Sequence, residues 1–284
     1  MSKVDLVIPD THHKWTLAED IIRWAKDHYD LGTIYFLGDY FDDWGDGPYQ
    51  SRKTAEWLVG STNDSQRVHL IGNHDTPYMC NTVIETLGIK DSEEIDRFAQ
   101  KYLRIAGCSG WDPHKHRAIN EVDGIEEAFK KLKTVVRYNE YVRISHAGLA
   151  DHFNEDEFWG LVWLREEDVF TDDEFFYELR KLCGAGYSRG GEIARPGPFW
   201  LDFHADKGFY CGDFNQIVGH SQGKNVRYFK NKNNTFALCL DTRMQHFGIL
   251  QAMDEESTLV TAYSWENPAK GDHITLRMKP PKVE

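Results

Sequence analysis

Five short clusters of Asp, Asn and His occur along this chain, and their side chains could bind metal ions. In one-letter code they are DTH (10–12), GDYFD (38–42), GNHD (72–75), SHAG (145–148) and GHS (219–221). Carboxylate, amide and imidazole groups are suited to Mn²⁺, Fe or Zn²⁺, whereas a structural zinc site would contain thiolates. The clusters therefore indicate a metal centre that supports catalysis.

Each cluster lies at the end of a short apolar run that predicts a β-strand. The runs are residues 4–8, 33–37, 68–71, 141–145 and 216–220. In α/β proteins, functional side chains gather where strands end. A single Gly-Asp pair usually marks a turn, and a single histidine after a strand is usually a surface or core residue. Five such clusters at strand ends indicate a common site.

The elements around these clusters predict the fold. Helical patterns at residues 17–25 and 52–59 alternate with the first three strands, and such an order brings strands parallel through helical crossovers. Short β runs dominate from residue 215 onward and look antiparallel. We therefore expect an α/β protein with two mixed β-sheets packed face to face as a sandwich and flanked by helices.

Nothing in the sequence divides the chain into separate domains. It has no internal repeat and no long low-complexity linker. We expect one domain over residues 1–284, with a mostly helical insertion around residues 78–133.

Composition excludes several classes of function. The chain has 284 residues and a net charge of −13, which disfavours binding to nucleic acid or to anionic membranes through charge. The longest stretches without Asp, Glu, Lys or Arg, residues 214–223 and 244–253, are too short to span a bilayer. No secretory signal is visible, and the five cysteines form no CxxC pair. We expect a cytoplasmic protein with reduced thiols.

Together the five clusters resemble the motifs of the calcineurin-like metallophosphoesterase superfamily. Its pattern is D-x-H, G-D-x-x-D, G-N-H-D/E, H-A/G-G and G-H, and the clusters occur here in that order. The resemblance implies two divalent ions, Mn²⁺ in the first place and Fe or Zn²⁺ as alternatives. Their implied ligands are Asp10, His12, Asp39, Asn73, His146 and His220. Asp10 and His12 would hold the first ion and Asp39 would bridge both.

The same resemblance implies how the reaction proceeds. A hydroxide that bridges the two ions would attack phosphorus. His74 is the candidate general acid that protonates the leaving group, and Asp42 would hold its orientation. Gly38, Gly72 and Gly219 are expected to let the backbone turn sharply beside the metals.

Two departures from the family pattern concern the substrate. Protein phosphatases of the superfamily carry a phosphate-clamping Arg shortly after the second motif, where this chain has Asp43 and Trp44. Phosphodiesterases often end in G-H-x-H, but here Ser221 and Gln222 follow His220, an ending that resembles the bacterial and phage serine/threonine-phosphatase-like branch. Candidates for the missing clamp are Arg189, Arg195 and Arg165.

The sequence therefore predicts a phosphatase that hydrolyses a phosphomonoester, either in a phosphoprotein or in a small phosphorylated metabolite or nucleotide. The alternative is a phosphodiesterase or nucleotide pyrophosphatase with the same dinuclear site, and a non-catalytic binding module is a further alternative. Cys108, His114 and His116 could suggest another metal site, but one thiol without a partner motif favours a polar loop.

Overall fold

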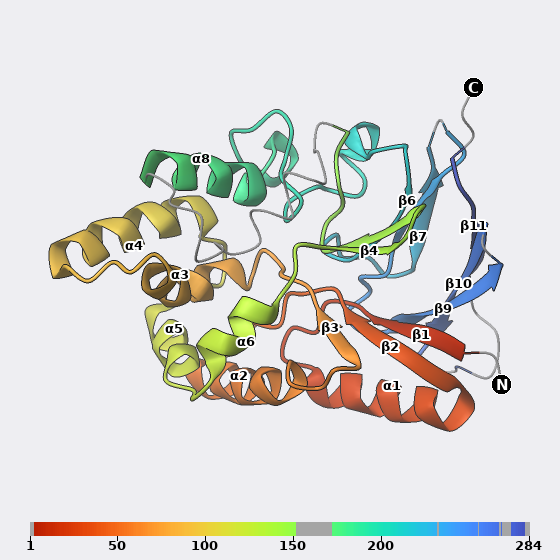
Figure 1. Ribbon diagram of the computed structural model, residues 1–284, viewed down its shortest axis with the longest axis horizontal. Coiled ribbons are helices and arrows are strands. Elements are labelled where there is room, and N and C mark those ends of the chain that lie inside the picture. Colours follow the sequence, from red (N-terminus) through yellow and green to blue (C-terminus); the bar gives the residue numbers. More distant parts are fainter. Residues whose placement is uncertain are drawn as a thin grey trace.

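Two β-sheets pack against each other, and the helices lie beside and below them in the view of Figure 1. The computed structural model describes residues 3–151, 172–231, 233–254, 256–266, 268 and 274–281. Both sheets are mixed, because each combines parallel and antiparallel neighbours. The predicted α/β class and the two mixed sheets are therefore confirmed.

The first sheet has the strand order β11-β10-β9-β1-β2-β3. Its strands are β1 (Lys3–Ile8), β2 (Asp30–Phe36), β3 (Arg67–His69), β9 (His246–Asp254), β10 (Ser257–Ser264) and β11 (Ile274–Met278). The first three strands are parallel, as predicted, because α1 (Trp15–His28) and α2 (Pro48–Ser61) form the crossovers between them. β9, β10 and β11 pair antiparallel, which was also expected.

The second sheet has the order β4-β5-β6-β8-β7 and corrects one expectation. Its strands are β4 (Val135–Asn139), β5 (Val142–Ser145), β6 (Asn215–Val218), β7 (Arg227–Lys230) and β8 (Phe236–Cys239). β6 is parallel to both β5 and β8, although the later strands looked antiparallel in sequence. The reason is that the chain passes from β6 to the sheet edge as β7 and returns as β8 between them.

Helices fill the segment between β3 and β4. They are η1 (Thr76–Met79), α3 (Cys80–Thr86), α4 (Ser92–Ala106), α5 (Pro113–Asn120) and α6 (Ile125–Lys131). Further along lie α8 (Asp172–Cys183), η2 (Tyr187–Arg189) and η3 (Lys207–Phe209). The single domain over residues 1–284 stays a prediction. Within the described ranges no helix is long and apolar enough to cross a membrane.

Apolar side chains on alternate positions of β1 fill two separate cores. Val7 packs between the two sheets together with Ile144 of β5 and Leu250 of β9. Leu6 and Ile8 point to the opposite face and pack with residues of the helices. A strand that is buried on both faces has no room to shift its register, so the position of the chain after Ile8 is fixed.

His69 at the end of β3 is a neutral histidine buried in the helix-covered face of the sheet. Its ring stacks on Phe36 with centroids 4.3 Å apart, and its side chain is almost completely inaccessible. Its Nδ1 donates to the Tyr40 hydroxyl at 3.0 Å, and Ser61 Oγ donates to its Nε2 at 2.9 Å. Burial, and then the charge of Arg67, lower the pKa of His69 to about 3.

This lowered pKa predicts a specific loss of stability in mild acid. Between pH 6.5 and 3 the unfolded chain binds a proton at this position and the native state does not, so stability falls as pH falls. One such group contributes a slope of about 1.4 kcal/mol per pH unit. The free energy of unfolding, measured with urea at several pH values between 7 and 5, is therefore expected to fall less steeply with falling pH for His69→Gln than for the wild type. His114→Gln, at an exposed position, is the matched control, and equal slopes for all three proteins would contradict the assignment.

Candidate metal centre

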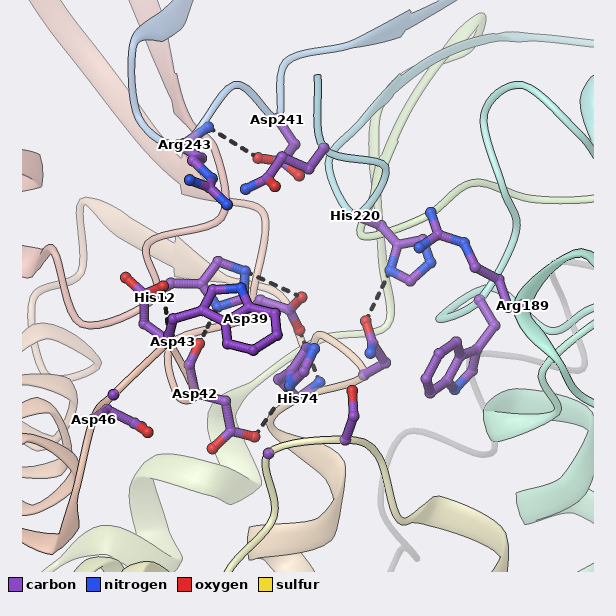
Figure 2. A pocket seen from close by; sticks show the side chains of 17 residues that line it. His12, Asp39, Asp42, Asp43, Asp46, His74, Arg189, His220, Asp241 and Arg243 are labelled. Carbon is purple, nitrogen blue, oxygen red and sulfur yellow. Dashed lines mark hydrogen bonds and ion pairs between the residues drawn. The ribbon is translucent and has the colours of Figure 1, made fainter. Parts of the chain in front are cut away.

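All six side chains that the sequence analysis proposed as ligands lie in one cluster where strands of the two sheets end. They follow β1, β2, β3, β5 and β6 and are Asp10, His12, Asp39, Asn73, His146 and His220. Figure 2 shows that His12 and Asp39 lie on one side of the site and His220 on the other. The topology brings them together because the two sheets place these strand ends next to each other.

The backbone around this cluster is held in an unusual conformation. His12, Asp39, Asp42 and His220 have φ values of 39°, 50°, 64° and 61°, in the left-handed region that residues other than glycine rarely adopt. Each such residue costs about 1–3 kcal/mol and persists only where its surroundings enforce it. Such strain is typical of functional sites.

Asp75 enforces this conformation at the loop after β2. Its buried carboxylate accepts the backbone N–H groups of Asp39 at 2.8 Å, Tyr40 at 2.7 Å and Gly72 at 2.8 Å. It therefore ties the loop after β2 to the loop after β3. Asp75 belongs to the GNHD motif, but no role was predicted for it from the sequence.

Three groups of donor atoms in the described residues are each compact enough to hold one cation, and two of them share Asp39. The two that share it are Asp10, His12 and Asp39, and Asp39, His146 and His220. The third group is Asp42, His74 and Cys108, at the edge of the cluster. Within each group the donor atoms lie within 4.8 Å of one another. Asn73 adjoins the second group, because its Oδ1 lies 3.0 Å from His146 Nε2 and 2.8 Å from His220 Nδ1.

The histidine tautomers fit cation binding. His146 donates its Nδ1–H to the Leu37 carbonyl at 2.8 Å, so the lone pair of its Nε2 faces the site. Burial lowers the pKa of His146, which keeps the imidazole neutral. Its Nε2 then faces the acceptor Asn73 Oδ1, and two acceptors 3.0 Å apart repel each other unless a cation lies between them. His12 also donates Nδ1–H to a carbonyl, that of Asp42, at 2.6 Å.

The surroundings of Asp10 also favour a nearby positive charge. One oxygen, Oδ2, accepts the His220 N–H at 2.7 Å, but Oδ1 is buried and has no hydrogen-bond partner in the part of the chain that the structure covers. Burial, and then the nearby carboxylates of Asp241 and Asp39, raise the pKa of Asp10. A buried carboxylate oxygen without a donor is costly, and a divalent cation would compensate it. The residues present therefore fit a metal centre.

Two glycines make room for the carboxylates. A Cβ on Gly219 would lie 1.9 Å from Asp10 Oδ1, and a Cβ on Gly72 would lie 2.0 Å from Asp39 Oδ1. Their role is thus close packing, since neither has a positive φ. Of the glycines singled out from sequence, Gly38 has the positive φ of a sharp turn, at 95°.

His74 is held by Asp42 at the edge of the metal cluster. Its Nδ1 donates to Asp42 Oδ2 at 3.1 Å, and its backbone N–H donates to Asp39 Oδ1 at 2.8 Å. Although burial opposes the charged form, the carboxylates of Asp39 and Asp42 raise the pKa of His74. The pair suggested from sequence therefore lies together, and its geometry suits an acid.

Lys115 of α5 holds Asp42 in turn. Its Nζ donates to Asp42 Oδ1 at 2.9 Å and to Asp46 Oδ1 at 2.6 Å, and Tyr78 donates its hydroxyl proton to the same Asp42 oxygen at 2.6 Å. Burial raises the pKa of Asp42, but His74, Tyr78 and Lys115 outweigh it and lower the pKa. The contact between Lys115 and Asp42 could not be predicted from the sequence, because the two residues lie 73 positions apart.

The loop that precedes α5 also contacts the site. Cys108 Sγ lies 3.4 Å from His74 Nδ1, whereas His114 is exposed and His116 contacts Asn81. The three residues therefore do not form one metal site, as the sequence analysis preferred. The loop is nevertheless part of the wall around His74.

The arginines proposed to bind phosphate lie in different places. Arg189 lines the pocket above the metal cluster, and its guanidinium contacts Asp202 at 2.8 Å and Ser221 Oγ at 3.0 Å. Arg195 forms a surface ion pair with Asp151 at 3.9 Å and is not among the residues that line the pocket. Arg165 lies outside the described residues. Arg243, for which no role was predicted from the sequence, also lines the pocket.

Comparison with known proteins supports the motif-based resemblance. A sequence profile of the calcineurin-like phosphoesterase family matches residues 6–230. No curated protein sequence matches the chain. Among solved structures, a protein serine/threonine phosphatase from Saccharomyces cerevisiae is similar over 100% of this chain and 82% of its own, with 14% identity and a TM-score of 0.44. The structure of a provisionally assigned diadenosine tetraphosphatase is similar over 98% of this chain and 94% of its own, with 13% identity and a TM-score of 0.40. Identities this low say nothing about a shared substrate.

The close packing of Gly219 gives a test of the site. Gly219→Ala is expected to displace the Asp10 carboxylate and to destabilise the protein by about 1–3 kcal/mol, as overpacking does. Gly208→Ala is the matched control, because nothing lies within 4 Å of the added Cβ. Thermal unfolding without Mn²⁺ measures the loss of stability, and the rise in Tm on adding Mn²⁺ measures whether Asp10 can still bind the cation. If Gly219→Ala had the same Tm as the wild type and the same rise in Tm with Mn²⁺, the close packing of Gly219 against Asp10 would be contradicted.

Proposed function

The chain belongs to the calcineurin-like phosphoesterase family, and we propose that it is a metal-dependent phosphatase that hydrolyses a phosphomonoester. The substrate would be a phosphoprotein or a small phosphorylated metabolite or nucleotide. The observation that carries this proposal is the arrangement of two donor groups around the shared Asp39, with His74 beside them.

Two divalent cations would occupy the donor groups. Asp10 and His12 would bind the first cation, and Asp39 would bind both cations. The second cation would also be bound by Asn73, His146 and His220. Carboxylate, imidazole and amide donors without a thiolate favour Mn²⁺, with Fe or Zn²⁺ as alternatives. When bound, such a pair supplies a water activated for attack on phosphorus and neutralises the charge of the phosphoryl oxygens.

His74 would protonate the leaving group. Its Nδ1–H is committed to Asp42, so Nε2 is the atom that carries the transferable proton. Its backbone is fixed by the hydrogen bond to Asp39 Oδ1, which sets the distance between the acid and the metal cluster. An acid in this position protonates the departing alkoxide and so lowers the barrier to its release.

Asp42 would keep His74 oriented, and its own position would depend on Lys115 and Tyr78. Both donate to Asp42 Oδ1 and leave Oδ2 for the imidazole. Lys115 also supplies a positive charge that keeps the buried carboxylate ionised. In this proposal Lys115 and Tyr78 are positioning residues.

Arg189 supports the preference for a monoester. Its contacts with Asp202 and Ser221 hold the guanidinium on the His220 side of the pocket, where Figure 2 shows it. A guanidinium held in advance binds a phosphate dianion with little loss of freedom. We further propose a reducing compartment, the cytoplasm, because the five cysteines are all free thiols.

A comparison of two chromogenic substrates tests the proposed reaction. With added Mn²⁺, p-nitrophenyl phosphate is expected to be hydrolysed faster than bis(p-nitrophenyl) phosphate, and a chelator should abolish both reactions. His74→Gln should lower kcat by about 10²- to 10⁴-fold, which is the usual contribution of a general acid. Faster turnover of the diester would favour the phosphodiesterase alternative, and no turnover of either would favour a binding module.

The role of Lys115 can be tested separately. Lys115→Met is expected to lower kcat by about 10- to 100-fold with little change in KM, because it frees Asp42 without touching the substrate pocket. Lys115→Arg should recover part of the loss, which a merely structural defect would not. Lys130→Met, at a solvent-accessible ion pair, is the control. An unchanged kcat in a folded Lys115→Met protein would rule out the positioning role.

A further inference from the structure

The pocket above the metal cluster is much larger than one phosphate group needs. Its volume is about 510 Å³, in the range of sites for small organic molecules. Its floor carries Asp39, Asn73 and His74, whereas Trp44 and Arg243 line it at positions that the proposed reaction does not use. The wall is therefore placed where the leaving group of a bound phosphate ester would lie.

Trp44 is unusually exposed for its size. Its exposed fraction is 93%, and every other tryptophan in the described ranges is at least partly buried. The backbone that carries it is nevertheless fixed, because its N–H donates to Asp43 Oδ1 at 2.8 Å and Asp43 Oδ2 pairs with Lys14 at 2.9 Å. An indole presented to solvent on a fixed loop, two residues after Asp42, is suited to stack on a planar ring.

Arg243 offers a positive charge to the same pocket. Its φ is 59°, and its backbone N–H donates to Asp241 Oδ1 at 3.2 Å, so its position is enforced at some conformational cost. Its guanidinium has no hydrogen-bond or ion-pair partner among the residues that the structure covers, although the protein has 46 acidic and 33 basic side chains. Figure 2 shows Arg243 and Arg189 on opposite sides of the pocket, with His74 below both in this view.

We propose that the pocket selects phosphomonoesters whose leaving group carries a planar aromatic ring. The ring stacks on Trp44, while Arg243 binds an anionic oxygen of the phosphate from the side opposite Arg189. This inference rests on the proposed phosphatase function and narrows its substrate class. Both a nucleoside monophosphate and the side chain of phosphotyrosine have this chemistry, and the assay below distinguishes them.

The test compares ring-bearing and ring-free monoesters. With the Mn²⁺-loaded protein, kcat/KM is measured for adenosine 5′-monophosphate, O-phosphotyrosine and glycerol 3-phosphate. The wild type should prefer at least one ring-bearing substrate, and the better of the two identifies the source of the ring. Trp44→Ala should lower the ratio of that substrate to glycerol 3-phosphate by about 5- to 100-fold, the contribution of one stacked ring. Trp44→Phe should retain most of the wild-type ratio.

Matched variants separate this inference from general damage. Tyr177→Ala removes another exposed aromatic residue, with an exposed fraction of 62%, that lies outside the pocket, and it should leave the ratio unchanged. Arg243→Gln should lower kcat/KM for all three substrates, because the phosphate is common to them. A Trp44→Ala ratio equal to that of the wild type would overturn the stacking role, and unchanged kinetics of Arg243→Gln would overturn the anion-binding role.

The outcome also distinguishes a failure of this inference from a failure of the proposed function. If the wild type hydrolyses none of the three monoesters, the phosphatase function itself is wrong. If it hydrolyses glycerol 3-phosphate as well as both ring-bearing substrates, the function stands and the ring selectivity is wrong. A readout without turnover is the quenching of tryptophan fluorescence by adenosine 5′-monophosphate in the presence of chelator. It should be weaker in Trp44→Phe, and equal quenching would contradict the proposal.

Discussion

The buried carboxylate of Asp39 is the constraint on which the rest of this site depends. Its neighbours are the imidazoles of His12 and His146 and the backbone N–H of His74, and it lies in a strained backbone conformation between two sheets. A buried negative charge must be compensated. The neighbouring imidazole, amide and carboxylate groups direct lone pairs toward the space beside Asp39, where a cation would supply that compensation. Two features hold the Asp39 carboxylate in this position. Asp75 accepts a hydrogen bond from the Asp39 backbone, and Gly72 lacks a side chain that would collide with the Asp39 carboxylate.

Much of the fold could be predicted from local sequence because its central strands are short, continuous apolar runs. β1 and β2 lie inside the first sheet and are covered by crossover helices, and such strands produce an unbroken apolar signal. β4 and β11 were not predicted, since polar residues such as Arg137 and Arg277 interrupt their apolar pattern. The parallel pairing of β6 with β8 also depends on the path of the chain through β7, which no local pattern encodes.

The donor cluster could be predicted because its residues occur in short motifs at strand ends, but the residues that support it could not. Lys115, Cys108 and Arg243 reach the site only through tertiary packing, and each is an ordinary residue in its own stretch of sequence. The net charge of −13 was equally uninformative about an anionic substrate. Two divalent ions would outweigh the carboxylates of Asp10 and Asp39 locally, so an acidic protein can present a cationic pocket.

The central claim is that Asp39 is shared by two cations, and counting bound metal tests it most directly. Protein freed of metal with a chelator would be titrated with Mn²⁺ by calorimetry, and its metal content would be measured by mass spectrometry. We predict two ions per chain for the wild type, and at most one, bound more weakly, for Asp39→Asn. A wild type that binds fewer than two ions, or an Asp39→Asn variant that still binds two with unchanged affinity, would contradict the account.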